Sequence, residues 1–396
     1  MAQGDPRCGG GAHPGRRAIR HHGRGRLGGS VMSEGAASQV DPALIEKLRS
    51  WLAAKIPGAS DLRIVDTVEP SQGFSSRTIL FRAQWQEQGK SREWPLVARI
   101  QRDTVCPMLA DVFHQYRVMK ALGEHIDAAV PKVVFAEQDA NVLGDPFFIM
   151  EQVNGRVPGD FPSYHQEGWV AELTDEGRET LWWNGIRAME KAHRASWRHF
   201  PFIGEPSVTA PDSEPPDARF YLHDFVGRWL DWAAQGQSYP ELEEALKFLL
   251  DNPPPIKQSG LVWNDARLGN TMYSDDLTVS ALFDFEVASL GPPELDMAHW
   301  LYLDEVFSTQ FGIPRISGIP DRQTTIKGFE DIYGWSMPYF AYYEAAVALK
   351  IVILTIRDYS NGKTMNAPEA LPGFLMDRLR QYLGEYREYL AGGSPA

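Results

Sequence analysis

Two stretches decide the fold of this 396-residue chain: Leu261-Val-Trp-Asn-Asp-Ala-Arg-Leu-Gly-Asn270 and, shortly after it, Phe283-Asp-Phe-Glu286. The first stretch contains a carboxylate, Asp265, followed five positions later by the amide of Asn270. The second places Asp284 directly after a short apolar run of the kind found in strands. Carboxylate and amide oxygens are good ligands for a divalent cation, and a carboxylate can also accept a proton. The order of these groups predicts a site for phosphoryl transfer.

A cation on the same loop strengthens this prediction. Arg267 lies two residues after Asp265, where its guanidinium can reach a transferred phosphate and offset the charge that grows in the transition state. An Asp and an Asn alone would also suit a plain polar turn. With the cation and the second carboxylate, the spacing is that of a kinase catalytic loop and its metal-binding aspartate. We predict Asp265 and Arg267 as catalytic residues. Asn270 and Asp284 are the predicted ligands of Mg²⁺.

The chain before these stretches predicts a small, mostly antiparallel β lobe with one inserted helix. Asp41 and Pro42 suit the start of a helix that runs to Ile56. Short runs of apolar, β-branched and aromatic residues then predict strands, interrupted once by a helical repeat. The predicted strands are Leu62–Val68, Thr78–Trp85, Trp94–Ile100, Lys132–Ala136 and Pro146–Glu151, and the inserted helix is Leu109–Leu122.

After a turn signal at Asn154-Gly155 the pattern changes to long helical repeats. The predicted helices are Leu173–Trp197, Arg219–Ala234, Leu242–Leu250 and Met337–Arg357. The acidic, proline-rich stretch Pro206–Pro216 has no periodicity and is expected to be an exposed loop. The predicted fold class is α+β, with an N-terminal lobe over residues 32–151, a hinge over 152–155 and a larger, mainly helical lobe over 156–396.

The first 31 residues have a different composition from the rest. They hold six arginines, one acid and many glycines, with no apolar face at helical spacing, so we expect them to be disordered. A secretory signal would need a central apolar stretch, which is missing. We expect the natural protein to begin at Met32, with residues 1–31 as upstream or artefactual sequence.

The net charge and the cysteine content limit the kinds of binding partner that the protein is expected to have. The net charge is −13 at pH 7 despite the basic leader, which disfavours nucleic acid and anionic membrane as partners. The apolar run Ala345–Leu354 contains Lys350 and is too short to span a bilayer. The only cysteines, Cys8 and Cys106, cannot build a disulfide framework, which favours a cytoplasmic setting. We therefore expect a small-molecule partner, no nucleic acid and no membrane, and leave the oligomeric state open.

In the order of its landmarks the chain resembles the aminoglycoside phosphotransferase and choline kinase superfamily, and in particular the phosphotransferase domains fused to some acyl-CoA dehydrogenases. The landmarks are Gly73-Phe-Ser-Ser-Arg-Thr78, Gln115-Tyr-Arg-Val-Met-Lys-Ala-Leu122, Gly144-Asp-Pro-Phe-Phe-Ile-Met-Glu-Gln-Val-Asn-Gly155, the Asp265 loop, and Asp284-Phe-Glu-Val-Ala-Ser-Leu-Gly-Pro-Pro-Glu-Leu-Asp296. The resemblance implies a two-lobed, protein-kinase-like fold. It also implies ATP- and Mg²⁺-dependent transfer of the γ-phosphate to a hydroxyl of a small molecule.

The resemblance also implies the residues that bind ATP. They are Gly73, Ser75, Ser76, Arg99, Gln115, Glu151 and Val153. The glycine and the two serines would cover the phosphates with backbone and hydroxyl donors. Backbone groups of Met150–Val153 would pair with the adenine edge, and Phe148 would pack against its rings.

The chain departs from the family pattern at several positions. Arg99 stands at the basic position of the third strand, and Gln115 stands where the family has a Glu. We expect Arg99 to grip phosphate and to donate one hydrogen bond to Gln115, with Asp111 as an alternative acidic partner. Trp263-Asn264 replaces the family's His-Gly, and Asp296 matches an aspartate that braces the catalytic loop.

Three functions remain open at this stage. A small-molecule kinase is favoured over a nucleotide-binding pseudokinase with a regulatory role, because the Asp265 set is intact. A protein kinase fits less well, since no activation loop separates Asp284 from Asp296. The resemblance to the domains fused to acyl-CoA dehydrogenases implies a hydroxyacyl-CoA-like acceptor in preference to an aminoglycoside or macrolide, and aromatic residues of the helical lobe suit an acyl body. These residues are Trp182, Trp183, Trp197, Trp229 and Trp232.

Overall fold

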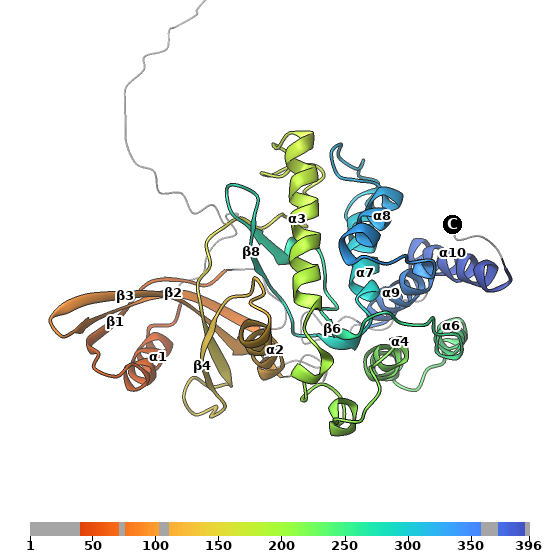
Figure 1. Cartoon of the computed structure of the whole chain (residues 1–396). Helices are drawn as coiled ribbons and strands as arrows, with labels where there is room; N and C mark the ends of the chain where they lie inside the picture. The colour runs from red at the N-terminus through yellow and green to blue at the C-terminus, as the bar shows by residue number, and fades with distance from the viewer. Residues whose placement is uncertain (1–39, 71–75, 103–110, 358–370, 393–396) are drawn as a thin grey trace, which may run out of the picture. The chain divides into compact units, whose positions relative to one another are not determined.

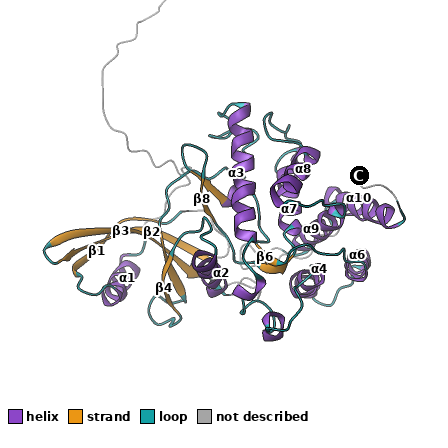
Figure 2. Ribbon diagram, in the orientation of Figure 1, coloured by secondary structure: helices purple, strands orange, loops and turns teal. Residues whose placement is uncertain are grey.

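The computed structural model describes residues 40–70, 76–102, 111–357 and 371–392. The leader, Gly73 and Ser75 lie outside these residues. Within them, one part of the chain is built on a sheet and the other is mainly helical (Figures 1 and 2). None of the helices in these residues is both long and apolar enough to cross a membrane.

The N-terminal lobe is a five-stranded antiparallel sheet in the order β1-β2-β3-β5-β4. Its elements are α1 (Pro42–Lys55), β1 (Ser60–Val68), β2 (Ser76–Glu87), β3 (Lys90–Gln101), α2 (Val112–His125), β4 (Val133–Glu137) and β5 (Phe147–Glu151). Gln88 and Gly89 both have positive φ, 50° and 77°, which suits the tight turn that joins β2 to β3. Leu48 and Leu52 of α1 are fully buried in one core with Ile79 of the sheet. The predicted strands and both helices are confirmed in type and order within the described residues, and the predicted start of the inserted helix at residues 109–110 lies outside them.

The second lobe contains longer helices. They are α3 (Asp175–His193), α4 (Ala218–Tyr221), α5 (Arg228–Ala234), α6 (Pro240–Asp251), α7 (Glu294–Val306), α8 (Arg322–Tyr333), α9 (Phe340–Leu354) and α10 (Gly373–Leu390). Helix α9 packs against α7 and α10, and most of its residues are buried. This central position gives the lobe its core and places α9 next to the loop that contains Asp265.

Two short antiparallel sheets hold the stretches that contain the predicted site. Strand β6 (Gly260–Val262) pairs with β9 (Ser289–Gly291), and β7 (Thr271–Tyr273) pairs with β8 (Val279–Leu282). The chain therefore leaves β6 just before Asp265, enters β7 just after Asn270 and leaves β8 just before Asp284. Pairing of β7 with β8 is what brings the two stretches together.

Some predictions for this lobe need correction. The predicted helix Arg219–Ala234 is divided into α4, a π-helical segment over Leu222–Gly227, and α5. Helices α7, α8 and α10 were not among the predicted helices. The stretch Pro206–Pro216 begins with a short 3₁₀ turn, and Pro216 is buried, so it is not wholly exposed.

Candidate active site

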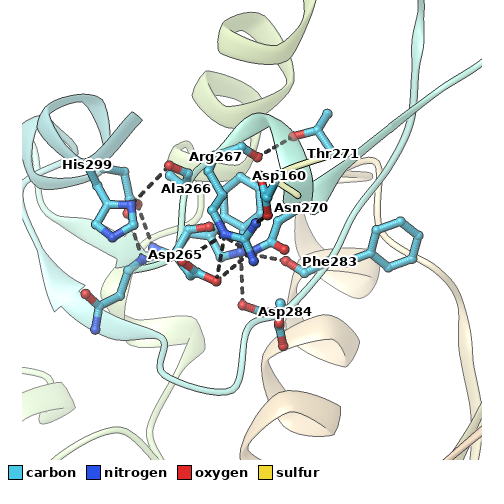
Figure 3. Close-up of polar contacts among 12 residues, drawn as sticks. Asp160, Asp265, Ala266, Arg267, Asn270, Thr271, Phe283, Asp284 and His299 are labelled. Atoms are coloured by element: carbon cyan, nitrogen blue, oxygen red, sulfur yellow. Dashed lines mark hydrogen bonds and ion pairs between the residues drawn. The ribbon is translucent and has the colours of Figure 1, made fainter. Parts of the chain in front are cut away.

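Asp265 and Asn270 lie in direct contact, as their spacing predicts (Figure 3). A 3₁₀ turn over Leu268–Asn270 folds the amide back onto the carboxylate. Asn270 Nδ2 donates to Asp265 Oδ2 over 2.6 Å and to the Asp265 carbonyl over 3.0 Å. Because the nitrogen faces Asp265, the side-chain oxygen of Asn270 is the atom that can face a cation.

Asp284 is brought to the same place by a backbone hydrogen bond. The Phe283 N–H donates to the Asn270 carbonyl over 2.9 Å (Figure 3). Asp284 has a φ of 64°, in the left-handed region, and its Oδ1 is buried without a hydrogen-bond partner among the described residues. Its nearest cation is Arg99, whose Nη2 lies 3.7 Å from Oδ1. Burial raises the pKa of Asp284, although Arg99 acts in the opposite direction. A buried carboxylate oxygen with so little compensation fits a divalent cation.

Asp265 has the electrostatics of a group that stays ionised. Burial raises the pKa of its carboxyl, but the charge of Arg267, together with other nearby groups that include Lys350 and the Asn270 amide, outweighs burial, so the pKa lies below its usual value. Arg267 Nε lies 3.3 Å from Asp265 Oδ1. The carboxylate is therefore available as a proton acceptor at neutral pH.

Asp160 is a member of this cluster that the sequence did not reveal. Arg267 Nη1 donates to Asp160 Oδ2, so the guanidinium bridges Asp160 and Asp265 (Figure 3). Asp160 Oδ1 is buried without a partner among the described residues, and burial raises the pKa of this carboxyl. A side chain at Gly269 would collide with both Arg267 and Asp160, so glycine permits the contact. No sequence signal links Asp160, in an irregular loop of the same lobe, to a residue so distant in the chain.

Arg99 has different partners from those expected. Its Nη1 donates to Thr78 Oγ1 over 3.0 Å, its Nη2 faces Asp284, and its Nε is buried without a partner in the described part of the chain. Gln115 is buried, and among the described residues no hydrogen bond joins it to Arg99. The expected Arg99–Gln115 bond is therefore absent, because the arginine turns toward the Asp284 carboxylate.

Helix α2 is held to the second lobe by other groups. Asp111 caps α2 by accepting from Phe113 N over 2.8 Å and pairs with Arg117 over 2.7 Å, so it is not the partner of Arg99. His114 Nε2 lies 2.9 Å from the carbonyl of Ala288, in the segment that follows Asp284. This contact links the helix to the predicted metal site without an ion pair.

The predicted adenine-binding segment is only partly as expected. Phe148 is fully buried against Tyr116, with ring centroids 5.9 Å apart, so it has no surface to offer a nucleotide. The Glu151 N–H already donates to the backbone carbonyl of Lys132 over 2.9 Å. Val153 takes part in none of the backbone hydrogen bonds of the described residues, so its peptide groups are open to a ligand.

The loop before Asp265 is fixed from α7. Asp296 accepts hydrogen bonds from Trp263 N over 2.6 Å, from Asn264 N over 2.7 Å and from His193 Nε2 over 2.8 Å. The bracing contacts expected of Asp296 are present, and it lies in the first turn of α7 after the N-cap residue Pro293. These bonds set the backbone direction from which Asp265 projects.

Known proteins match this chain in sequence. The sequence model of the phosphotransferase enzyme family matches residues 66–323, well over half of the chain. Acyl-CoA dehydrogenase family member 11 of Mus musculus is 24% identical over 287 residues, which is 70% of this chain and 34% of that protein. Family member 10 of the same species is 25% identical over 232 residues, 58% of this chain and 20% of that protein. The chain thus matches only a minor part of each relative.

Solved structures match the fold. A Ralstonia eutropha protein assigned to the aminoglycoside phosphotransferases has a TM-score of 0.55 at 21% identity, and the match covers 85% of this chain and 94% of that one. Macrolide 2'-phosphotransferase type I has a TM-score of 0.51 at 16% identity, with 89% and 98% covered. At these identities the likeness shows the fold, and it confirms the predicted two-lobed, kinase-like architecture.

Proposed function

This chain belongs to the phosphotransferase enzyme family, and from that premise we propose that it transfers the γ-phosphate of ATP to a hydroxyl of a small molecule. The observation that carries the proposal is the convergence of Asp265, Asn270 and Asp284. The Asp265 carboxylate is kept ionised, and Oδ1 of Asp284 is buried without a hydrogen-bond partner among the described residues. A proton acceptor beside a cation site is the arrangement that phosphoryl transfer requires.

In this proposal Asp284 and the side-chain oxygen of Asn270 would hold Mg²⁺, which would neutralise charge on the phosphates. Ser76 Oγ and Arg99 Nε are buried and have no partner among the described residues, so they can donate to phosphate oxygens. Together with Val153 at the adenine edge, they are the described residues that we assign to ATP. Gly73 and Ser75 remain predictions.

The chemical step balances as follows. The acceptor hydroxyl oxygen attacks the γ-phosphorus, the new P–O bond forms, and the bond from phosphorus to the β,γ-bridging oxygen breaks. The hydroxyl proton passes to a carboxylate oxygen of Asp265, and ADP leaves with the bridging oxygen. Arg267, already 3.3 Å from that carboxylate, supplies positive charge close to the moving phosphoryl group.

For the acceptor we propose a molecule with an apolar body, such as a hydroxyacyl-CoA, in preference to an amino sugar. Phe161 directly follows Asp160, and this residue is 71% exposed. It contacts Phe307 and Phe311, with centroids 5.5 and 6.1 Å away, and Phe311 is 49% exposed. An exposed apolar patch beside the catalytic cluster suits an acyl chain.

The tryptophans named earlier do not contribute to such a surface as a group. Trp182 and Trp229 are buried in the helical core, so they cannot contact an acceptor without repacking. The argument for an apolar acceptor therefore moves from the tryptophans to the phenylalanine patch formed by Phe161, Phe307 and Phe311.

A pseudokinase is the second candidate, and one observation favours it. Arg99 lacks an acidic partner on α2 and faces Asp284 across 3.7 Å, which a nucleotide and its cation would have to rearrange. Such a protein would bind nucleotide without turning it over. Its Asp265 would then have no catalytic consequence.

The experiment that tests the proposal is ADP release on a panel of acceptors with ATP, with and without Mg²⁺. The panel contains short- and long-chain hydroxyacyl-CoAs, an aminoglycoside, a macrolide and a choline-like alcohol. We expect Mg²⁺-dependent turnover that improves with the length of the acyl chain. Nucleotide binding without turnover on any acceptor would favour the pseudokinase, and preference for the aminoglycoside would reject the apolar acceptor.

A further inference from the structure

A buried lysine lies behind the catalytic loop. Lys350, near the middle of α9, is 4% exposed. Its Nζ donates to the backbone carbonyl of Asn264 and, over 2.9 Å, to Asn264 Oδ1, and it lies 3.0 Å from His299 Nε2. All of these partners are neutral groups, and among the described residues Lys350 forms no ion pair. Burial of a cation without a counter-ion is costly, which calls for an explanation beyond packing.

Asn264, the main partner of Lys350, directly precedes Asp265. Its φ is 66°, a left-handed conformation that asparagine tolerates better than most residues. Besides Lys350, its Oδ1 accepts from Tyr221 Oη over 3.1 Å, and its Nδ2 donates to the Val287 carbonyl over 2.8 Å. Val287 follows the predicted metal-binding segment, so the asparagine ties the two stretches of the site to each other.

His299 extends the contact to the other side of Asp265. A lysine ammonium only donates, so His299 Nε2 must accept, and the proton of the neutral ring is on Nδ1. Nδ1 lies 3.1 Å from the carbonyl of Ala266 and donates to it (Figure 3). Burial, followed by the charge of Lys350, lowers the pKa of His299 to about 3, which agrees with a neutral ring.

We propose that Lys350 is a positioning residue of the phosphotransfer reaction. It fixes the peptide carbonyl before Asp265 directly and the one after Asp265 through His299. The aspartate is thereby held in one orientation between two clamped carbonyls. This inference rests on the proposed function for its catalytic consequence, and on the contacts alone for its structural part.

The charge of Lys350 supports the same role. Burial lowers its pKa to about 8, while Asp265 and Asp296 raise it and Arg267 lowers it, so the ammonium persists at neutral pH. Replacement by a shorter or neutral side chain would therefore remove both donors and charge. A misplaced base can cost about 10²-fold in rate even when substrate still binds.

The test compares Lys350→Met, which keeps the apolar stem, with Tyr342→Phe. Tyr342 is buried in the same helix and donates to the Leu249 carbonyl over 3.1 Å, so its variant also loses one buried hydrogen bond. We expect Lys350→Met to lower kcat by about 10- to 100-fold with KM for ATP within about threefold. The control should keep kcat within about twofold. Wild-type kcat in Lys350→Met would overturn the proposal.

A second variant reaches the same contact from the loop. Asn264→Gly suits the positive φ and removes the side chain that Lys350 holds. If the two residues act as one unit, the double variant should lose no more than about threefold beyond Lys350→Met, whereas multiplied losses would contradict the shared contact. Asn264→Gly alone should lower kcat as well, which keeps the proposal testable if Lys350→Met does not fold.

Hydrogen exchange separates this inference from the proposed function. Amides of residues 263–267 should exchange faster in Lys350→Met than in wild type and Tyr342→Phe, with no turnover needed. Unchanged exchange would show that Lys350 does not fix the loop around Asp265, whether or not the protein is active. Absence of turnover in the wild type would reject the proposed function. The exchange result would still show whether Lys350 fixes the loop around Asp265.

Discussion

The loop around Asp265 and the proposed nucleotide-facing side of the site, formed by Ser76, Arg99 and Asp284, differ in how their polar groups are satisfied. Around Asp265 the protein supplies the partners itself: Asp296 binds the preceding N–H groups, and Lys350 and His299 bind the flanking carbonyls. On the proposed nucleotide-facing side, Ser76 Oγ, Arg99 Nε and Asp284 Oδ1 are buried without hydrogen-bond partners among the described residues. A buried polar group without a partner costs about 1–3 kcal/mol. The comparison indicates a preformed base beside a surface that a ligand completes.

The largest expected effect is on catalysis by Asp265, which should be separable from the binding of ATP. Asp265→Asn keeps the shape of the loop but removes the proton acceptor, so kcat should fall by about 10²–10⁴-fold with nearly unchanged ATP affinity. Steady-state kinetics and calorimetric titration with ATP measure the two quantities. Asp276→Asn, in the exposed β7–β8 turn, is the matched control and should keep full activity. If ATP affinity fell as much as kcat, Asp265 would be needed for binding ATP as well, which would contradict the distinction between the two regions.

The second effect falls on the nucleotide-facing side. Asp284→Ala removes a predicted metal ligand, so Mg-ATP affinity should fall by about 10- to 100-fold along with turnover. In the wild type, Mg-ATP at 100 times its Kd should stabilise the fold by about 2.7 kcal/mol, and thermal scans should show a much smaller shift for the variant. Asp275→Ala, a fully exposed control, should shift like the wild type. Equal shifts in all three would remove Asp284 from the metal site.

Effects on kcat alone are expected where the two regions meet. Arg267→Ala should lower kcat by about 10²-fold, because its charge acts on the transition state. Asp160→Asn should lower kcat by only about tenfold, since it loosens the guanidinium without removing it. Steady-state kinetics with saturating ATP distinguishes the two. A loss for Asp160→Asn as large as that for Arg267→Ala would mean that Asp160 contacts the reacting groups itself.

The smallest effect concerns the neutral ring of His299. Its pKa is about 3 in the folded state against about 6.5 when unfolded, so the unfolded chain takes up the proton first as pH falls. Its contribution to stability is full above about pH 6.5 and is lost toward pH 3, by up to about 1.4 kcal/mol per pH unit. His299→Asn can still donate to Ala266 but cannot titrate. Urea unfolding at several pH values should therefore give a flatter slope for the variant, and identical slopes would contradict a neutral buried histidine.

The comparison also explains what the sequence could predict. The Asp265–Asn270 contact depends on spacing within one turn, and Asp284 follows a strand with a clear apolar pattern. These three residues could therefore be predicted from the sequence. Alternating and β-branched patterns likewise predicted all five strands of the N-terminal lobe. Local periodicity and short spacing were sufficient for the parts of the site that lie close in the chain.

The remainder depended on contacts that no local pattern records. Asp160 and Lys350 come from an irregular loop and a helix far from the catalytic loop, so only the fold brings them to it. Helix α7 is buried on nearly every side, which leaves no apolar stripe to recognise. The predicted hydrogen bond between Arg99 and Gln115 was wrong. The family pattern placed Gln115 as the partner of Arg99, whereas the nearby carboxylate of Asp284 attracts the arginine instead.

The most direct test of the central claim follows the phosphoryl group. Wild type and Asp265→Asn are each incubated with Mg²⁺, a hydroxyacyl-CoA and ATP that carries an isotopic label in its γ-phosphate, and the acceptor is analysed by mass spectrometry. We predict that the label appears on the acceptor hydroxyl with wild type and is reduced by about 10²–10⁴-fold in rate with Asp265→Asn. Label found only in free phosphate, at equal rates for both proteins, would contradict the account.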